Sequence, residues 1–409
     1  MSNKTKTTAP KEDATPALVP KLRFPEFRNA EGWAENELGN VCEILNNRRR
    51  PITGSERQPG PYPYYGASGI VDFVGDFIFN ERLLLVGEDG AKWGAFERTA
   101  FIAEGEYWVN NHAHVLKPIA IADTLLENYL TMIDLAPFVT GAAPPKLTLG
   151  KLKGIPVPVP PTTDEQQKIA ECLSSVDELI AAQARKLDAL KTHKKGLMQQ
   201  LFPREGETQP RLRFPEFQYA GEWEAETLGQ LADYENGKAY EKDITEDGKY
   251  IVVNSRFIST DGVVRKYTNA EYLIANAGEV LMVLSDLPKG RALAKCYFVE
   301  TDHRYAVNQR VCRLKPRRID GKFLYYTLNR HPRLLAFDDG LNQTHLSKGG
   351  VTECPLCVPP QKAEQQRIAD CLTSLDDIIA AQTQKLEALK THKKGLMQQL
   401  FPSPEEVEA

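Results

Sequence analysis

Residues 165–203 read EQQKIAECLSSVDELIAAQARKLDALKTHKKGLMQQLFP, and residues 364–402 repeat them as EQQRIADCLTSLDDIIAAQTQKLEALKTHKKGLMQQLFP. Of these 39 positions 30 are identical, at a constant offset of 199 residues. Both stretches lack internal proline, are rich in Ala, Leu, Gln, Lys and Glu, and end at a proline, which is typical of long helices. The sequence therefore predicts two near-identical helices, over residues 162–203 and 361–402.

Apolar residues recur along both predicted helices with a 4,3 spacing, the pattern of a coiled-coil seam. At 1.5 Å per residue each helix would be roughly 55 Å long. A simple buried helix is the alternative, but it also needs a partner. We expect that partner to be the other helix of the same chain rather than a helix of a second chain. Short connections to the globular parts favour an antiparallel pair. The seam comprises Ile169, Leu173, Val176, Ile180, Leu187, Leu190, Leu197 and Leu201, with equivalents Ile368, Leu372, Leu375, Ile379, Leu386, Leu389, Leu396 and Leu400, and it is interrupted by Gln183, Lys194, Gln382 and Lys393.

A second, shorter repeat opens each half of the chain. The motif LRFPEF occurs at residues 22–27 and 212–217, and a tryptophan follows it at Trp33 and Trp223. Between the repeats the two halves diverge almost completely. The divergent stretches are predicted to be two domains, domain 1 (residues 21–161) and domain 2 (residues 204–360). A disordered tail is expected at residues 1–20 and an acidic tail at residues 403–409.

Both domains contain many short β-rich runs punctuated by Gly, Asn and Asp, and one helical stretch each, from Asp123 and from Gly321. This pattern predicts compact α/β domains with a mixed or mostly antiparallel sheet. The predicted fold class is α+β, with two α/β domains joined by two long antiparallel helices that form a coiled coil with pseudo-two-fold symmetry.

Composition excludes several classes of protein. The 409 residues are 42% hydrophobic and 26% charged, as in globular proteins, and the formal net charge is −4. Seven scattered cysteines indicate reduced thiols, and no apolar run approaches the 18 residues or so of a membrane span. The polar first twenty residues do not form a signal peptide. We expect a cytoplasmic protein that makes no membrane contact.

The near-neutral average hides local basic segments. Residues 289–333 carry twelve Lys or Arg against three acids, and Arg48, Arg49 and Arg50 form a compact run. Cations interleaved with Asn, Gln and Tyr suit contacts to phosphates and base edges, although a solvated surface is the alternative for any single residue. The candidate DNA-binding residues are Arg48, Arg49, Arg50, Asn110, Asn111, His112, Lys146, Lys289, Arg291, Asn308, Gln309, Arg310 and His345.

No catalytic constellation or metal site is predicted. Phosphate-binding glycine motifs do not occur. The CxxC pair Cys354 and Cys357 has no second pair and no counterpart in domain 1, so a structural role is favoured over zinc. His112 and His114 align with Arg310 and Cys312, which argues against a metal pair.

Taken in order, the motifs resemble those of the specificity subunits of type I restriction–modification systems. They are LRFPEF…W…LG, YYGASG (64–69), GEDGA (87–91), WVNNHAHVLKP (108–118), IPVPVPP followed by TTDEQQKIA, and the paired KKGLMQQLFP ends. The resemblance covers about residues 22–402.

This resemblance implies a phage-defence protein with two target recognition domains, each reading one half of an interrupted site in double-stranded DNA, while the paired helices set the spacer. It also implies assembly with two modification subunits, which bind S-adenosylmethionine and methylate adenine N6, and with two restriction subunits, which use ATP and Mg²⁺. The chain itself would bind no cofactor and carry no chemistry. A stand-alone DNA-modifying enzyme and a coiled-coil scaffold that binds no DNA are the alternatives.

Overall fold

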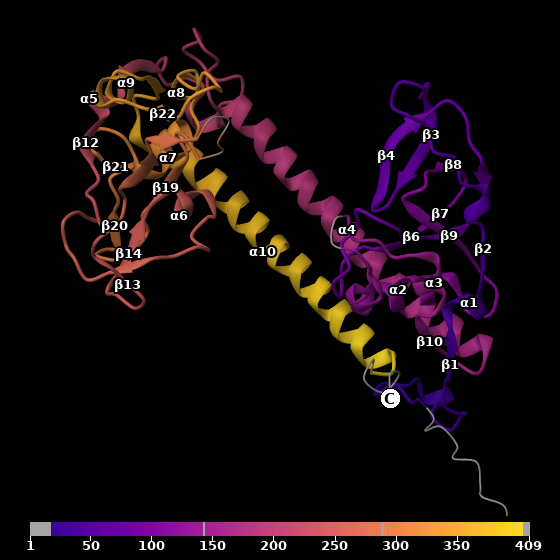
Figure 1. Cartoon of the computed structure of the whole chain (residues 1–409). Coiled ribbons are helices and arrows are strands. Elements are labelled where there is room, and N and C mark those ends of the chain that lie inside the picture. The colour runs from indigo at the N-terminus through magenta and orange to yellow at the C-terminus, as the bar shows by residue number, and fades with distance from the viewer. Residues whose placement is uncertain (1–17, 142–143, 288–289, 291, 404–409) are drawn as a thin grey trace, which may run out of the picture. The chain divides into compact units, whose positions relative to one another are not determined.

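The computed structural model describes residues 18–141, 144–287, 290 and 292–403 (Figure 1). The chain forms two compact units: unit 1 comprises residues 1–185 and 383–409, and unit 2 comprises residues 186–382. Each unit therefore holds one globular domain, the beginning of one long helix and the end of the other. The predicted tails lie outside the described residues except at 18–20 and Ser403. Leu18 is buried and forms a β-bridge with Trp33.

The two long helices are present as predicted. They are α4 (Thr163–Leu201) and α10 (Lys362–Leu400), of 39 residues each. Thr162 Oγ1 accepts a hydrogen bond from the Glu165 amide (3.2 Å) and so caps α4, whereas in α10 the backbone carbonyl of Gln361 accepts from the Glu364 amide (3.0 Å). Both helices end at the leucine of LFP, Leu201 and Leu400, two residues before a proline that cannot continue the helix.

Within each unit, the beginning of one helix packs against the end of the other. In unit 1, Ile169 and Leu173 share a hydrophobic core with Leu400, and Asp177 forms an ion pair with Lys393 (2.8 Å). In unit 2, Leu201 shares a core with Ile368 and Leu372, and Lys194 pairs with Asp376 (2.5 Å). All the predicted seam residues are buried or half-buried. Each unit thus contains an antiparallel helix pair, as expected.

Domain 1 is built from two small sheets and a two-stranded ribbon. The ribbon pairs β1 (Ala34–Glu37) with β10 (Pro156–Val159). One sheet is antiparallel, in the order β2-β9-β6-β7; the other, in the order β4-β3-β8-β5, contains the parallel pair β3–β8. The strands are β2 (Cys42–Ile44), β3 (Pro59–Gly66), β4 (Gly69–Val74), β5 (Phe79–Asn80), β6 (Leu83–Gly87), β7 (Ala100–Ala103), β8 (Glu106–Val109) and β9 (Ala113–Pro118), and the helices are α1 (Leu38–Val41), α2 (Asp123–Met132) and α3 (Leu149–Lys153).

Domain 2 has a similar topology although its sequence differs, with one more strand in its second sheet and an additional pair, β18–β22. Its ribbon pairs β11 (Glu224–Thr227) with β23 (Pro355–Val358), and its sheets have the orders β12-β21-β17-β19 and β13-β15-β14-β20-β16, with β14–β20 parallel. The remaining elements are β12 (Ala232–Asn236), β13 (Ile244–Thr245), β14 (Tyr250–Val253), β15 (Tyr267–Thr268), β16 (Ile274–Ala275), β17 (Val280–Val283), β18 (Ser285–Asp286), β19 (Cys296–Phe298), β20 (Tyr305–Val307), β21 (Val311–Pro316), β22 (Thr344–His345), α5 (Leu228–Leu231), α6 (Ser255–Ser259), α7 (Gly321–Leu328), α8 (Pro332–Leu335) and α9 (Lys348–Thr352).

The predicted mixed and antiparallel sheets, the helical stretches from Asp123 and Gly321, and the α+β class are therefore confirmed. None of the described helices combines the length and the apolar character needed to cross a membrane.

The repeated motifs form the joint between each domain and the helices. Trp33, which follows the first LRFPEF motif, lies edge-on to Phe401 (6.1 Å between ring centroids) from the end of α10. Trp223, which follows the second, lies edge-on to Phe202 (6.3 Å) from the end of α4. In each unit, the repeated helix end and the tryptophan that follows the LRFPEF motif therefore pack together in the same way.

Candidate nucleic-acid interface

One turn in each domain carries several of the predicted DNA-binding residues. It follows β8 in domain 1 and β20 in domain 2, after strands that pair in parallel with β3 and β14. The Asn110 amide donates to the Tyr65 carbonyl (3.0 Å), and the Asn308 amide donates to the Val253 carbonyl (3.1 Å). The two turns are therefore structurally equivalent, in agreement with the alignment of His112 with Arg310.

The first asparagine of each turn has a structural task. Asn110 is 5% exposed and its Oδ1 accepts a hydrogen bond from the His112 amide (2.8 Å). Asn308 is 6% exposed and its Oδ1 accepts from the Arg310 amide (3.4 Å). Each of these side chains stabilises its turn by accepting a hydrogen bond from the backbone amide two residues further on. The residues that follow them are exposed: Asn111, His112, Gln309 and Arg310.

Two further segments meet each turn. In domain 1 the Glu88 amide donates to the His112 carbonyl (2.8 Å), and the Leu147 amide donates to the Glu88 carbonyl (2.8 Å). In domain 2 the Leu284 amide donates to the Arg310 carbonyl (2.9 Å), and the Leu346 amide donates to the Leu284 carbonyl (2.8 Å). Lys146 and His345, which precede these leucines, are therefore equivalent and lie beside the turns.

The β3–β4 hairpin also reaches this place in domain 1. A Cβ atom on Gly87 would lie 2.7 Å from the Ala67 carbonyl oxygen and 2.6 Å from the Ala91 Cβ, so only glycine permits the close approach. The hairpin motif YYGASG, the loop motif GEDGA and the turn within WVNNHAHVLKP consequently gather at one site.

Most cations of the domain 1 site are paired internally. Glu88, which is largely buried, accepts hydrogen bonds from Arg49 (2.5 Å) and Lys146 (2.8 Å). Burial alone would raise the pKa of the Glu88 carboxyl, but the hydrogen bonds from Arg49 and Lys146 bring that pKa below its usual value. His112 Nδ1 lies 2.5 Å from Asp89 Oδ1.

Arg48 lies apart from this network. Its guanidinium forms an ion pair with Glu81 (2.7 Å) and stacks over the Phe79 ring at 4.6 Å. The three consecutive arginines of the sequence therefore serve different purposes, and Arg50 alone among them has no ion pair with any residue that the structure describes.

His114 is a buried structural residue. Its Nε2 donates to the Leu147 carbonyl (2.7 Å), and its Nδ1 accepts from Asn46 Nδ2 (2.8 Å), in the tautomer that these partners select. Burial lowers the pKa of the imidazole. His112 instead pairs with Asp89 at the surface. In the described ranges no group of three or more His, Cys, Asp and Glu side chains could hold a metal ion.

In domain 2 the equivalent turn contains two neutral amide side chains that both donate hydrogen bonds to one carboxylate. Glu241 Oε1 accepts hydrogen bonds from Asn308 Nδ2 (3.2 Å) and Gln309 Nε2 (3.1 Å). His345, on β22, is exposed and pairs in register with Ser285 on β18. The candidates Lys289 and Arg291 lie outside the described residues. Glu88 and Glu241 were not predicted as site residues, because an acid that orients donors has no signature in a single sequence.

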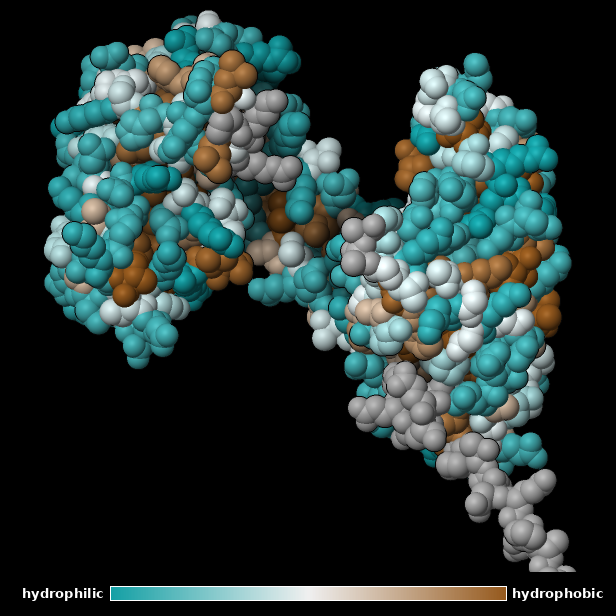
Figure 2. Space-filling model, viewed as in Figure 1, coloured by the Kyte–Doolittle hydropathy of each residue, from teal (hydrophilic) through white to brown (hydrophobic). Residues whose placement is uncertain are grey.

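The basic stretch at 289–333 does not form a continuous basic surface in the described part of domain 2. Five of its cations pair with acids from distant segments. These pairs are Lys295–Asp261, Arg313–Glu235, Arg317–Asp233, Arg318–Glu226 and Arg333–Glu205. Figure 2, coloured by hydropathy, shows hydrophilic residues over most of the visible surface of both units, with smaller hydrophobic areas between them.

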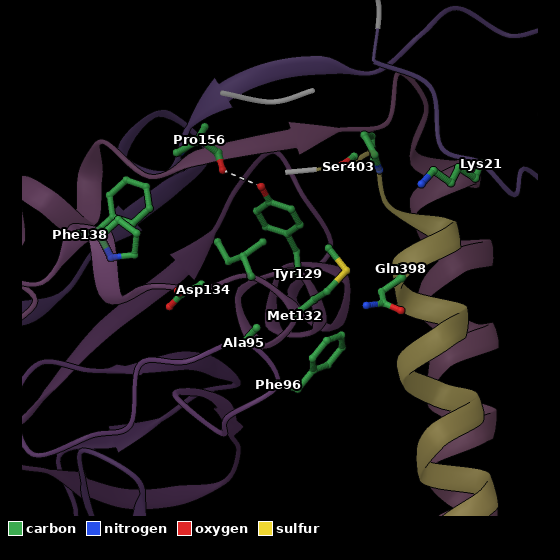
Figure 3. Close-up of a pocket in the computed structure, with 13 residues that line it drawn as sticks. Lys21, Ala95, Phe96, Tyr129, Met132, Asp134, Phe138, Pro156, Gln398 and Ser403 are labelled. Carbon is green, nitrogen blue, oxygen red and sulfur yellow. Dashed lines mark hydrogen bonds between the residues drawn. The ribbon is translucent and has the colours of Figure 1, made fainter. Parts of the chain in front are cut away.

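A cavity in unit 1 lies away from this site, at the joint with the end of α10. It measures about 650 Å³, and its lining is mostly apolar, with Phe96, Met132 and Phe138 around it (Figure 3). The Tyr129 hydroxyl, which also lies there, donates to the Pro156 carbonyl (3.0 Å). Lys21 and Asp134 are its charged lining residues, an arrangement that offers no acid–base or nucleophilic pair.

Comparison with known proteins identifies the family. The model described as "Type I restriction modification DNA specificity domain" matches residues 30–192 and 220–391. The chain therefore belongs to the family of type I restriction–modification DNA specificity proteins and carries two specificity domains in tandem. This confirms the family that the sequence motifs indicated, and with it a role in DNA recognition rather than catalysis.

Individual relatives agree with this assignment. The chain is 22% identical to the type I restriction enzyme MjaVIII specificity subunit of Methanocaldococcus jannaschii, over 92% of this chain and 93% of that protein. It is 36% identical to S.HindORF215P of Haemophilus influenzae, assigned as a type I restriction enzyme specificity subunit, over 34% of this chain but only 37% of that protein.

A solved structure shares the fold. The S subunit of a type I restriction–modification system from M. genitalium matches with a TM-score of 0.64 and 16% identity, over 94% of this chain and 100% of that one. The duplicated architecture is thus a known one.

Proposed function

We propose that each domain reads one half of an asymmetric, interrupted site in double-stranded DNA. The observation that carries this proposal is a shared strand framework that presents different side chains at one equivalent place. Where domain 1 presents the exposed Asn111 and His112 and the half-exposed Lys146, domain 2 exposes Gln309, Arg310 and His345. Two domains with the same fold but different exposed side chains fit a target whose halves are unrelated. Two domains with the same exposed side chains would fit a palindrome.

The exposed groups have the chemistry of base readout. Amide side chains such as Asn111 and Gln309 can donate and accept in pairs, and an arginine such as Arg310 matches the acceptor pair of guanine in the major groove. Buried partners fix the backbone from which these groups project, as Asn308 does for Arg310. Such rigid support favours discrimination between bases because the reading groups cannot readily shift to a wrong base.

The long helices would act as the ruler between the half-sites and as the platform for partner subunits. A helix of 39 residues is about 58 Å long, more than one turn of the double helix at about 34–36 Å. Two modification subunits that bind S-adenosylmethionine and methylate adenine N6, and two restriction subunits that use ATP and Mg²⁺, would complete a cytoplasmic complex. The chemistry would then reside on those subunits.

Methylation mapping tests the proposal directly. The chain is reconstituted with its modification subunits, and methylated adenines are mapped in DNA before and after one heptad is removed from the middle of both helices. We expect two unrelated half-sites that stay the same while their spacer shortens by about three base pairs, since seven residues span about 10.5 Å. Unchanged spacing with altered half-sites would contradict the ruler role.

The alternatives give different outcomes. Transfer of labelled methyl groups by the purified chain alone would indicate a stand-alone enzyme. A reconstituted complex that retains all genomic fragments equally would indicate a scaffold without sequence preference.

A further inference from the structure

One cation occupies the same structural position in both domains, although the sequence alignment does not reveal it. The Arg50 amide donates to the Val109 carbonyl (3.3 Å), and the Lys238 amide donates to the Val307 carbonyl (2.9 Å). Each valine directly precedes the first asparagine of the exposed turn. Lys238 also forms a parallel β-bridge with Asn308. Arg50 and Lys238 therefore flank the two turns in the same way.

Both side chains are exposed, and neither forms an ion pair with any residue that the structure describes. Their neighbours differ in this respect. Arg48 pairs with Glu81, while Arg49 and Lys146 both pair with Glu88. Since an internally paired cation must give up its partner before it can neutralise a phosphate, Arg50 is the best-placed phosphate ligand of the arginine run.

Each domain holds its cation against the turn by a different device. In domain 1 the indole Nε1 of Trp108 donates to the Arg50 carbonyl (2.5 Å), which ties the arginine to β8. In domain 2 the residue before the cation is Gly237, and a Cβ there would lie 2.0 Å from the Asn308 carbonyl oxygen. The two domains thus place a cation at the same position by different local contacts. This indicates that the positive charge at that position is the feature the domains share.

We propose that Arg50 and Lys238 each bind a DNA phosphate beside the bases read by the adjacent turn, and so set the position of that turn on the duplex. The inference rests on the proposed function. Phosphate contacts position a protein on DNA without carrying sequence information, whereas the turn residues would discriminate between bases. In domain 2 the Glu241 carboxylate accepts hydrogen bonds from Asn308 and Gln309, two residues of the turn itself.

The test uses the complete complex with its modification subunits and a genomic DNA fragment that the wild-type complex retains. Dissociation constants are measured between 50 and 200 mM salt for Arg50→Gln and Lys238→Gln. We expect each variant to reduce the slope of log K against log salt by about one, because one phosphate contact is lost, and to leave base preference at both half-sites unchanged.

Conservative and matched variants keep the experiment decisive. Arg50→Lys and Lys238→Arg retain the charge and should keep the wild-type slope. Lys117→Gln and Lys249→Gln remove cations at the opposite ends of β9 and β14, and should also keep it. Thermal unfolding of every variant checks the fold.

Three results overturn the inference: an unchanged slope in both glutamine variants, an altered base preference, or an equal loss in the lysine controls. Failure of the wild-type complex to select any fragment would instead contradict the proposed function itself, so the two failures are distinguishable.

Discussion

Arg23 and Glu165 lie 142 positions apart and form a buried, two-pronged ion pair, in which Nε and Nη2 of the arginine each donate to one carboxylate oxygen at 2.7 Å. Trp33 Nε1 donates to the same carboxylate (3.2 Å). Unit 2 repeats the arrangement with Arg213, Glu364 and Trp223, at 2.8 Å for both prongs and 3.3 Å for the indole. A single carboxylate near the start of each long helix thus binds both the arginine of the LRFPEF motif and the tryptophan that follows it.

Replacement of Glu165 by Gln should destabilise unit 1 by about 3–5 kcal/mol, because Arg23 would keep its charge in a buried place without a counter-ion. Differential scanning calorimetry, combined with hydrogen–deuterium exchange to locate the change, measures this. Glu364→Gln is the matched control and should act in the same way on unit 2. Equal loosening of both units by either single variant would contradict a local role.

The pair Asp177 and Lys393 should define helix orientation more than stability. Asp177 is about half exposed, so solvent screens the pair and its contribution should stay below about 1 kcal/mol. Asp177→Lys would place two cations together and lower the unfolding temperature of unit 1, and the reversed pair Asp177→Lys with Lys393→Asp should restore it. A reversed pair as unstable as the single variant would show that the charges do not interact.

Asn308 and Arg310 should respond differently to truncation, although both were predicted as DNA-binding residues. Arg310→Ala should weaken binding to the second half-site and leave the unfolding temperature within about 1 °C of wild type, because its side chain is exposed. Asn308→Ala removes the acceptor that closes the turn and should lower both affinity and stability. Binding titrations with either half-site scrambled, alongside thermal unfolding, separate the two effects.

Unit 1 should lose stability in mild acid through His114. Burial lowers the pKa of this imidazole below its ordinary value of about 6.5, so the stabilisation is fully present above that pH. As the pH falls, the unfolded chain binds a proton that the folded chain still excludes, and the free energy of unfolding declines. Domain 2 has Cys312 at the equivalent place, and burial raises the pKa of that thiol to about 12.

The variant His114→Cys therefore tests this titration. It should be less stable than wild type at pH 7, because two hydrogen bonds are lost, and the gap should narrow towards pH 5. Hydrogen–deuterium exchange rates of the backbone amides in β6 and β9 measure this difference in stability. A gap that stays constant across this range would assign the acid sensitivity to another group.

The helices were predictable because their signals are local: heptad spacing, good helix formers and a terminal proline such as Pro203. The joint was predictable only in part. The repetition of LRFPEF and Trp33 showed that these residues matter together, but the contact of Arg23 with Glu165 depends on tertiary folding.

The candidate site was the least predictable part. Arg49 meets Glu88 because β2, β9 and β6 are adjacent in a sheet whose order differs from the order in the sequence. Asn110 was predicted to read bases, but a short amide can equally satisfy a neighbouring backbone amide, and the structure uses it so. Lys238 carried no local signal, since its role follows from a backbone hydrogen bond to Val307.

The burial of Phe401 beside Trp33 has a consequence for biosynthesis. Domain 1 is synthesised before domain 2, but Phe401, whose ring packs in the core of unit 1, directly follows α10 and is therefore synthesised after domain 2. Unit 2 needs only residues 186–382 and can close earlier. The half that is made first therefore matures last, and a chain released before its final helical turns would hold an incomplete first domain. The core of unit 1 would therefore form completely only in chains in which domain 2 has already been synthesised.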